Sequence, residues 1–449
     1  MRVLEDASLK SLAIALAQLD AGFSDLPALP PVTPEDTSRM DVVLSRVAAR
    51  LTGNYPYFHP LYAGQMLKPP HPVARAAYAL AMWLNPNNHA LDGGRASSQM
   101  EIEAVAALAK MFAFPQHLGH LTSGGTFANL EALWIAGKLN PGKKIVASAQ
   151  AHYTHSRICK VLGIDFASIS ATPNGTMDLT ALRTALAQED VGTVVATLGT
   201  TSTGAVDPLD EILALREQYG FRLHVDAAYG GYFTLAETLA PAARRAFDCI
   251  AHADSIVVDP HKHGLQPYGC GCILFRDPAV GRFYKHDSPY TYFSSAELHL
   301  GEISLECSRP GASAVALWAT QQLLPMDRGG EFARDLDACL AAARELHARL
   351  AADPHFVVPA APQLDIAIWA VRAPDVAASS AAARRIFGTA AEHGLHLALA
   401  DLPLSFFPAD TWPTASQPTV TCLRSVLMKP EHLQWLDQIW FRLQAAIKA

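Results

Sequence analysis

Residues 255–264, with the sequence Ser-Ile-Val-Val-Asp-Pro-His-Lys-His-Gly, carry the strongest structural signal in the chain. The β-branched run at 256–258 predicts a short buried strand, and Pro260 ends it because proline cannot extend a hydrogen-bonded ladder. Lys262 follows directly at the exit of this strand, between two histidines. A lysine beside other cations and apolar walls loses part of its preference for the charged form, so it can act as a nucleophile near neutral pH. A lone His-Lys-His is more often a surface loop, so the rest of the chain must decide between the two interpretations.

Length and composition limit the classes of protein that fit. The chain has 449 residues, 50% of them hydrophobic and 17% charged, which is enough to bury a large core in more than one domain. A net charge of −7 without a basic stripe argues against a nucleic-acid partner. No apolar stretch reaches the ~18–20 residues of a membrane span, and the N-terminal sequence lacks a signal-peptide pattern, so we expect a cytoplasmic protein. The seven scattered cysteines predict reduced thiols and no metal site.

Strand and helix patterns alternate from residue 73 to about residue 300. Short apolar strands are predicted at 144–147, 191–198, 222–225 and 255–258, and helices at 100–112, 125–139, 156–162, 179–188 and 208–218. Such alternation predicts an α/β fold with a central, mostly parallel sheet and helices on both faces.

The two ends of the chain have different patterns. An amphipathic helix is predicted at residues 1–20, followed by a proline-rich connector at 26–34. Such a segment is too small to fold alone, so we expect it to pack on another surface such as a partner subunit. A long helix from residue 332, a strand at 364–369 and two later helices predict a second, smaller α/β domain. The expected organisation is a helical and extended arm at 1–70, a large domain at 71–330 and a small domain at 331–449.

In open parallel sheets, ligands bind beyond the carboxyl ends of the strands, so the residues after each predicted strand are candidates. Thr-Ser-Gly-Gly-Thr at 122–126 opens a helix and offers backbone N–H groups to an anion. Three further candidates follow the next strands, namely His152, a hydroxyl-rich loop that contains Thr200, and Asp226. Glycine turns, single histidines and loop hydroxyls are common in structural roles, so each signal is weak alone. A buried carboxylate such as Asp226, however, is costly unless it meets a cation or a shared proton.

Together with Lys262, these groups match the needs of pyridoxal phosphate. The cofactor aldehyde needs a lysine for a Schiff base, and the phosphate needs N–H and hydroxyl donors. The pyridine nitrogen needs a carboxylate that keeps it protonated, and an imidazole on the ring would fix its plane. This conjunction is far more specific than any single residue in it.

The same residues make the chain resemble the group II pyridoxal-phosphate-dependent amino acid decarboxylases, which include aromatic amino acid, glutamate and cysteine sulfinate decarboxylases. The resemblance runs from about residue 59 to residue 318. Its most specific motifs are His-Val-Asp-Ala-Ala-Tyr-Gly-Gly at 224–231 and Asp-Pro-His-Lys at 259–262, and weaker matches lie at 122–129, 151–154 and 197–201. The resemblance implies the aspartate-aminotransferase-like fold, called fold type I, in a homodimer whose active sites lie at the subunit interface.

The resemblance also implies a role for each matching residue. Lys262 would form the Schiff base with the cofactor, Asp226 would pair with the pyridine nitrogen, and His152 would stack on the ring opposite Ala228. Asp259 would also lie beside the cofactor, where some members carry asparagine, and either side chain accepts a hydrogen bond. The phosphate and the ring substituents would be held by Ser123, Gly124, Gly125, Thr200 and His261.

The implied reaction is decarboxylation of an L-amino acid to the corresponding amine and carbon dioxide, through the Schiff base on Lys262. Relatives of this kind use a tyrosine as proton donor, on a loop that closes from the partner subunit. The candidates here are Tyr284, Tyr290 and Tyr292, and we prefer Tyr292 as the catalytic residue.

The substrate stays open at this point. Aromatic residues at 54–62 and Trp83 are consistent with an apolar pocket, whereas Arg95 or Arg309 would select an acidic side chain. Arg309 either binds a carboxylate or forms an interface salt bridge, and the sequence does not separate the two.

Two other functions compete with this interpretation. Another fold type I enzyme, an aldehyde-lyase acting on a phosphorylated amino alcohol, shares the pattern around the lysine but releases no carbon dioxide. A nucleotide-binding or regulatory protein is disfavoured, since the chain has no G-x-x-x-x-G-K-[ST] and no G-x-G-x-x-G after a strand. The central prediction is the pairing of Lys262 with Asp226, while His263 is expected to be a packing residue.

Overall fold

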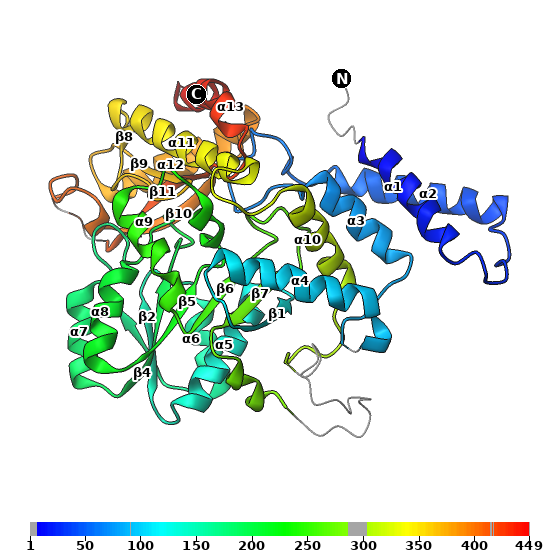
Figure 1. Ribbon diagram of the computed structural model, residues 1–449. Helices are drawn as coiled ribbons and strands as arrows, with labels where there is room; N and C mark the ends of the chain where they lie inside the picture. Colours follow the sequence, from blue (N-terminus) through cyan, green and yellow to red (C-terminus); the bar gives the residue numbers. More distant parts are fainter. Residues whose placement is uncertain (1–6, 90, 286–302, 414, 416, 449) are drawn as a thin grey trace.

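The structure, a computed structural model, describes residues 7–89, 91–285, 303–413, 415 and 417–448 (Figure 1). A seven-stranded sheet carries the centre of the molecule, and a four-stranded sheet lies in a separate layer of the C-terminal part. Within the described residues, no helix is long and apolar enough to cross a membrane.

The large sheet is mostly parallel. Only β7 runs antiparallel to its two neighbours, and the other pairings are parallel. The strands at 191–197, 255–258 and 271–275 are buried along their whole length because helices cover both faces, whereas the edge strand at 166–169 is largely not buried. The strand order is β1 (Leu118–Thr122), β7 (Gly271–Phe275), β6 (Ser255–Val258), β5 (Arg222–Asp226), β4 (Val191–Thr197), β2 (Lys144–Ser148) and β3 (Phe166–Ile169).

Alternate side chains of each strand enter different cores, because successive residues of a strand point to opposite faces. Val194 packs in the cluster with α4, α7, α8, α9 and α10, whereas its neighbour Val195 packs in the cluster with α6 and part of α5. The predicted α/β fold with helices on both faces is therefore confirmed. The helices of this part are α3 (Pro72–Met82), α4 (Arg95–Met111), α5 (Gly125–Leu139), α6 (Thr154–Leu162), α7 (Leu179–Gln188), α8 (Leu209–Tyr219), α9 (Pro241–Asp248) and α10 (Gly311–Leu323), with 3-10 turns η1 (Leu91–Gly93), η2 (Gly231–Leu235), η3 (Ile250–His252) and η4 (Pro278–Phe283).

The C-terminal part is built on an antiparallel sheet. Its order is β10 (Ala398–Pro403), β11 (Thr419–Val426), β9 (Ile366–Val371) and β8 (Phe356–Val357), and η6 (Leu404–Phe406) follows β10. The helices α11 (Glu331–Ala352), α12 (Val376–Glu392) and α13 (His432–Lys448) pack on it around the buried Trp369. The N-terminal half of α11 instead packs in the core of the large sheet, so this helix connects the two parts.

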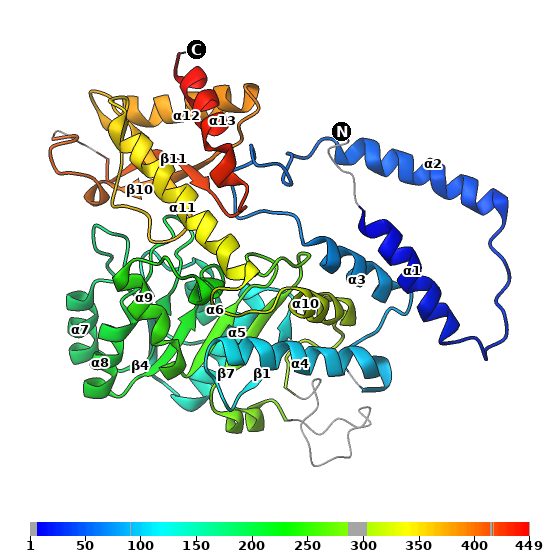
Figure 2. The same cartoon turned by 45° about the horizontal axis from the view of Figure 1, so that its top comes forward.

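The N-terminal segment forms two helices and then joins the C-terminal part. α1 (Ser8–Ala21) and α2 (Pro34–Leu51) project from the body of the molecule, and neither contains a buried residue (Figures 1 and 2). α2 was not predicted, although Thr33 caps it through the Asp36 N–H and Pro34 opens it. Further on, the Ala63 N–H donates to the His396 carbonyl at 2.9 Å, which places this stretch against the small sheet.

Candidate active site

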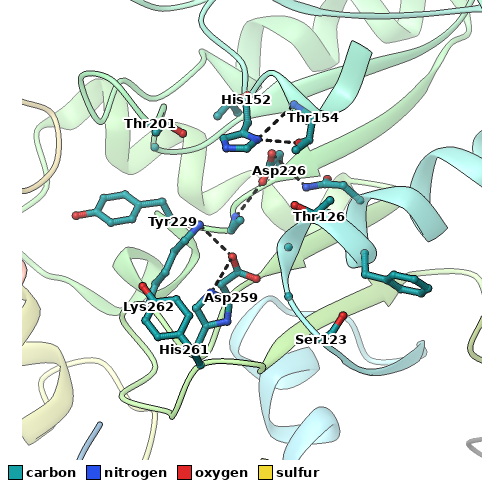
Figure 3. Close-up of a pocket in the computed structure, with 18 residues that line it drawn as sticks. Ser123, Thr126, His152, Thr154, Thr201, Asp226, Tyr229, Asp259, His261 and Lys262 are labelled. Atoms are coloured by element: carbon teal, nitrogen blue, oxygen red, sulfur yellow. Dashed lines mark hydrogen bonds and ion pairs between the residues drawn. The ribbon is translucent and has the colours of Figure 1, made fainter. Parts of the chain in front are cut away.

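A cavity of about 470 Å³ lies where the loops after the strands converge (Figure 3). Its walls come from the start of α5 and from the segments that follow β2, β4, β5 and β6. Nine residues singled out from the sequence line it, and these are Ser123, Gly124, Gly125, His152, Asp226, Ala228, Asp259, His261 and Lys262. The convergence follows from the parallel sheet, whose carboxyl ends meet at one edge.

Lys262 extends into this cavity from the turn after β6. Its Nζ atom lies 3.0 Å from Oδ2 of Asp259, and its backbone N–H donates to the Asp259 carbonyl at 2.9 Å. The Asp259 carboxylate thus holds the Lys262 amine near the carboxyl end of β6. The second oxygen of Asp259, Oδ1, is buried and finds no hydrogen-bond partner among the described residues, so it can accept another donor.

Asp226 ends β5, and its carboxylate is 5% exposed at the floor of the cavity. Oδ2 accepts from Nε2 of His155 at 2.8 Å and from Nδ2 of Asn129 at 3.4 Å, while Oδ1 accepts from the Ala228 N–H at 3.1 Å. Burial alone would raise the pKa of Asp226, but the His155 hydrogen bond and these N–H donors hold it well below its usual range. Asp226 therefore stays a carboxylate facing the cavity.

Two more buried residues, His224 and Ser255, orient the Asn129 amide. Oδ1 of Asn129 accepts from Nε2 of His224 at 2.9 Å, and Nδ1 of His224 lies 2.9 Å from the Ser255 hydroxyl. Burial lowers the pKa of His224 to about 3, so its ring is neutral at neutral pH. A neutral ring that donates through Nε2 orients the Asn129 amide with its N–H toward Asp226, so one chain of hydrogen bonds positions the carboxylate.

The two histidines of the cavity have defined hydrogen bonds. Nδ1 of His152 accepts from the Thr154 N–H at 3.4 Å and lies 2.8 Å from its hydroxyl, which leaves the ring proton on Nε2. Nδ1 of His261 donates to the Cys270 carbonyl at 2.7 Å, so its Nε2 is the acceptor atom. Burial lowers the pKa of both imidazoles, which favours their neutral forms.

The start of α5 forms an anion cradle. Gly124 has φ +152°, a conformation that side chains other than glycine's rarely adopt, and a Cβ atom on Gly125 would lie 2.7 Å from Oδ2 of Asp259. The Ser123 N–H already donates to a carboxylate, Oε2 of Glu306, at 3.0 Å. The N-terminus of a helix offers backbone N–H groups to anions, and the Glu306 carboxylate already binds one of them here. This arrangement fits the phosphate of pyridoxal phosphate.

The residues present therefore fit the cofactor. The amine of Lys262, the carboxylate of Asp226 and the N-terminus of α5 are the three groups that its aldehyde, ring nitrogen and phosphate require, and all three face one cavity.

Some expected residues lie elsewhere. The hydroxyl of Thr200 turns away, 3.0 Å from the Thr203 hydroxyl and 3.0 Å from the Ala205 N–H that it accepts, whereas Gly199 and Thr201 line the cavity. Gly199 has φ +101°, a left-handed conformation that favours glycine. Thr201 is therefore a second candidate contact of the ring substituents, beside Thr200.

The candidate proton donors are not in the described cavity. Tyr290 and Tyr292 lie outside the described residues. Tyr284 is buried beside β7, and its hydroxyl donates to Glu131 at 2.8 Å, which raises its pKa together with burial. It does not line the cavity.

The arginines proposed for substrate selection also lie away from the cavity. Arg309 is buried and makes an ion pair with Glu101 at 2.7 Å and a hydrogen bond to the Leu121 carbonyl at 2.6 Å. Arg95 is exposed at the start of α4. Arg309 thus makes a salt bridge within the chain, whereas an interface salt bridge was the alternative considered from the sequence.

His263, expected as a packing residue, is one. Its ring is fully buried, with Nε2 3.1 Å from Oδ2 of Asp365, and Asp365 also accepts from the Tyr229 hydroxyl at 2.6 Å. Asp365 directly precedes β9 of the C-terminal sheet, so this group connects the cavity wall to the small domain. Arg424 of β11 makes a second connection, because its guanidinium donates to the carbonyls of Thr201 and Ser202 at 2.6 and 3.0 Å.

Sequence reasoning missed several groups of the site. His155 lies three residues after His152 in the same turn, a spacing that could have indicated a shared site. Asn129 was part of a recognised motif without a role. Tyr229 was likewise part of a recognised motif without a role, and Tyr268 gave no local signal, because their positions depend on partners far along the chain, such as Asp365 and the Met66 carbonyl.

A mostly parallel α/β sheet with a lysine, a buried carboxylate and an anion cradle at one edge defines a pyridoxal-phosphate-dependent enzyme of fold type I. The comparisons with known proteins give its family. The sequence pattern described as "Pyridoxal-dependent decarboxylase conserved domain" matches residues 129–371. The chain belongs to the pyridoxal-dependent decarboxylases, as the sequence motifs predicted.

Named relatives agree with this assignment. The L-tyrosine decarboxylase of Enterococcus faecium is 29% identical over 414 residues, covering 68% of each chain. The probable L-tyrosine/L-aspartate decarboxylase of Methanothermobacter thermautotrophicus is 31% identical over 260 residues, covering 57% of this chain and 69% of the relative. The enzyme is therefore a pyridoxal-phosphate-dependent amino acid decarboxylase, and the aldehyde-lyase alternative is not favoured.

Solved structures show the same fold. Oryza sativa TDC, solved with PLP and tryptamine, has a TM-score of 0.78 at 18% identity, covering 100% of this chain and 99% of that one. Mouse CSAD has a TM-score of 0.77 at 21% identity, covering 94% and 90%. At these identities the likeness establishes fold type I.

Proposed function

We propose that this enzyme decarboxylates an aromatic L-amino acid, with Lys262 holding the cofactor covalently. The observation that carries the proposal is the position of Lys262 and Asp226 in one cavity with the N-terminus of α5. Pyridoxal phosphate, when bound, supplies the electron-accepting ring that takes up the electrons of the broken carbon–carboxylate bond. The chain's own groups orient the substrate and control its protons.

Each polar group of the cavity has a defined task in this proposal. Asp226 would pair with the ring nitrogen and keep it protonated, since the lowered pKa of Asp226 keeps it anionic. His152 would stack on the ring, and its ring proton on Nε2 would be available to the substrate. The start of α5 at residues 123–126 and the imidazole of His261 would hold the phosphate, and Lys262 would hold the cofactor aldehyde until the substrate amine replaces it.

A neutral substrate side chain is favoured by the charges of the cavity. The cationic or potentially cationic groups among its described lining residues are Lys262, His152 and His261, and each is committed to the cofactor or the substrate carboxylate. A second carboxylate, as in aspartate, would be desolvated there without a cationic partner. Tyr229 and Tyr268 instead offer aromatic surface, and burial raises the pKa of Tyr268 to about 12, so it remains a neutral phenol.

The test is the release of carbon dioxide from single amino acids. We expect turnover with L-tyrosine, L-phenylalanine or L-tryptophan and a kcat/KM at least tenfold lower with L-aspartate and L-glutamate. D-tyrosine serves as the control for stereochemistry. A preference for L-aspartate would refute the aromatic assignment while leaving the decarboxylase family intact.

We also propose that the enzyme works as a homodimer, with the N-terminal helices against a second copy. α2 carries a stripe of exposed apolar side chains at helical spacing, comprising Met40, Val43, Leu44, Val47 and Leu51, each 46–59% exposed. A solvated helix with such a stripe is unusual in a monomer, because large exposed apolar patches normally mark interfaces.

Light scattering of the holoenzyme tests the dimer. We expect a mass near twice 48.2 kDa for the natural chain and a shift toward monomer for the double variant Val43→Asp and Val47→Asp. Arg46→Asp on the same helix, which alters charge outside the stripe, is the matched control. A monomeric natural chain would refute the proposal.

A reducing compartment, as in the cytoplasm, is consistent with the cysteines. All seven are free, and burial raises the pKa of several, including Cys159 to about 12.

A further inference from the structure

A second cavity, of about 180 Å³, lies behind the turn that carries Lys262. Its walls come from residues 58–72, from the turn after β6, from α11 and from the segment before α13. Most of the wall is apolar, with Phe58, Leu265, Phe332 and Leu336 among its members. The volume corresponds to about six water molecules at ~30 Å³ each, so a small organic molecule fits.

Two lysines enter this cavity without an ion-pair partner among the described residues. Nζ of Lys429, a residue only 3% exposed, donates to the Tyr62 carbonyl at 2.7 Å and to the Leu67 carbonyl at 3.4 Å. Nζ of Lys68 donates to the Met428 carbonyl at 3.2 Å. The polar partners that the described chain gives these ammonium groups are all carbonyl oxygens. Carbonyls satisfy the N–H groups but do not neutralise the charges, which is costly for buried cations.

Two acids also line this cavity. Asp335 and Glu431 are exposed, and neither forms an ion pair with Lys68 or Lys429 in the described contacts. The cavity thus combines a mostly apolar wall with two lysines and two exposed acids.

Burial is the main influence on the pKa of both lysines, and nearby acids oppose it. Burial and then Lys68 lower the pKa of Lys429 to about 7, and burial lowers the pKa of Lys68. An anion between the two would reverse this effect by favouring both charged forms. The titratable groups that face Lys429 from the surrounding elements are Lys68, Glu431, Cys339, His432 and Tyr62.

We propose that this cavity is a regulatory binding site for a small carboxylate with an apolar body. Its carboxylate lies between the ammonium groups of Lys68 and Lys429, and its body contacts Phe58, Leu265 and Phe332. The bound carboxylate supplies the ion-pair partner that the two lysines lack, and the apolar body of the ligand removes the apolar wall from water.

A bound carboxylate at this position has a short route to the active site. His263, which lines the second cavity, directly follows Lys262 in the chain and lies 3.1 Å from Asp365. Asp365 accepts from Tyr229, which lines the first cavity. Occupancy therefore acts on a wall shared by both cavities, and we expect it to change the KM or kcat of decarboxylation.

Isothermal titration of the holoenzyme with benzoate tests the site, with benzamide as the uncharged isostere. Lys68→Met and Lys429→Met keep the apolar stem and remove the charge, and Lys110→Met, an exposed lysine on α4, is the matched control. We expect benzoate affinity to fall at least tenfold in each of the first two variants and to stay unchanged in the control. Benzamide should bind at least tenfold more weakly than benzoate.

Two features separate this site from the substrate cavity. Benzoate bound beside the cofactor would shift the visible absorption of the holoenzyme and would be lost at saturating product amine. Benzoate bound between the two lysines is retained at saturating product amine. Above pH 7 the affinity should fall about tenfold per pH unit and binding should take up protons, because Lys429 then loses its charge before the anion arrives.

Equal binding of benzoate and benzamide, or unchanged benzoate affinity in Lys68→Met and Lys429→Met, would overturn the proposal. If one variant does not fold, the other carries the test.

Discussion

Replacing Gly125 by alanine should weaken cofactor binding, although helix propensity alone predicts the opposite. Gly125 begins α5, and glycine-to-alanine changes in helices usually add about 0.5–1 kcal/mol of stability. At this position, however, the new Cβ atom would lie 2.7 Å from Oδ2 and 3.0 Å from Oδ1 of Asp259. Ordinary contacts begin at 3.4 Å, so the carboxylate must move by about 0.7 Å (3.4 − 2.7).

The displaced Asp259 carboxylate is the one that holds Nζ of Lys262 at 3.0 Å, so the change disturbs the cradle and the lysine together. Overpacking of this kind costs about 1–3 kcal/mol, which corresponds to a loss of about 5- to 150-fold in affinity for pyridoxal phosphate if the cost falls on the bound state. Titration of the cofactor-free protein, followed by visible absorbance, measures the affinity, and thermal unfolding measures the stability.

Gly388→Ala is the matched control, because Gly388 lies in α12 and a Cβ atom there would meet no atom within 4 Å. It should leave cofactor affinity unchanged and keep or raise the unfolding temperature. Asp259→Ala should also cost less in the Gly125→Ala background than in the natural chain, since it removes the clash. If Gly125→Ala bound the cofactor as tightly as the natural chain, the close packing of Asp259 against α5 would be refuted.

Three further predictions concern charge. Asp226→Asn should retain bound cofactor but lower kcat for carbon dioxide release about 10²–10³-fold, because an amide cannot supply the anion; an undiminished kcat would contradict this role. Burial lowers the pKa of His432 to about 3, so stability should fall as the pH drops below about 6.5, and His432→Asn should reduce the slope by about 1.4 kcal/mol per pH unit in pH-dependent unfolding. Arg309→Met should cost about 3–5 kcal/mol of stability at an unchanged KM; a changed KM alone would favour substrate binding.

Much of the fold could be predicted from the sequence where the signal is local. The strand at 255–258 and the helix at 125–139 were placed from apolar runs and flanking glycine, and the structure has β6 and α5 with the same bounds. β7 was missed, because a short apolar run between Cys270 and Arg276 does not reveal that it returns antiparallel between β1 and β6. α2 was missed because its proline-rich entrance reads as a connector.

The candidate site divides in the same way. Residues that follow strands, such as Asp226 and Lys262, were predictable because the topology of a parallel sheet brings strand ends together. His155 and Tyr229 were not, since their roles depend on one hydrogen bond each, to Asp226 and to Asp365. Thr200 stays a prediction: its hydroxyl is bonded to Thr203 and to the Ala205 N–H, whereas Thr201 lines the cavity.

The most direct test of the central claim identifies the amine that carries the cofactor. Borohydride treatment of the holoenzyme fixes pyridoxal phosphate irreversibly to that amine, and peptide mass spectrometry then locates it. We predict the adduct on the peptide that contains Lys262, with none in Lys262→Ala. An adduct on another lysine, or full decarboxylase turnover by Lys262→Ala, would contradict the account.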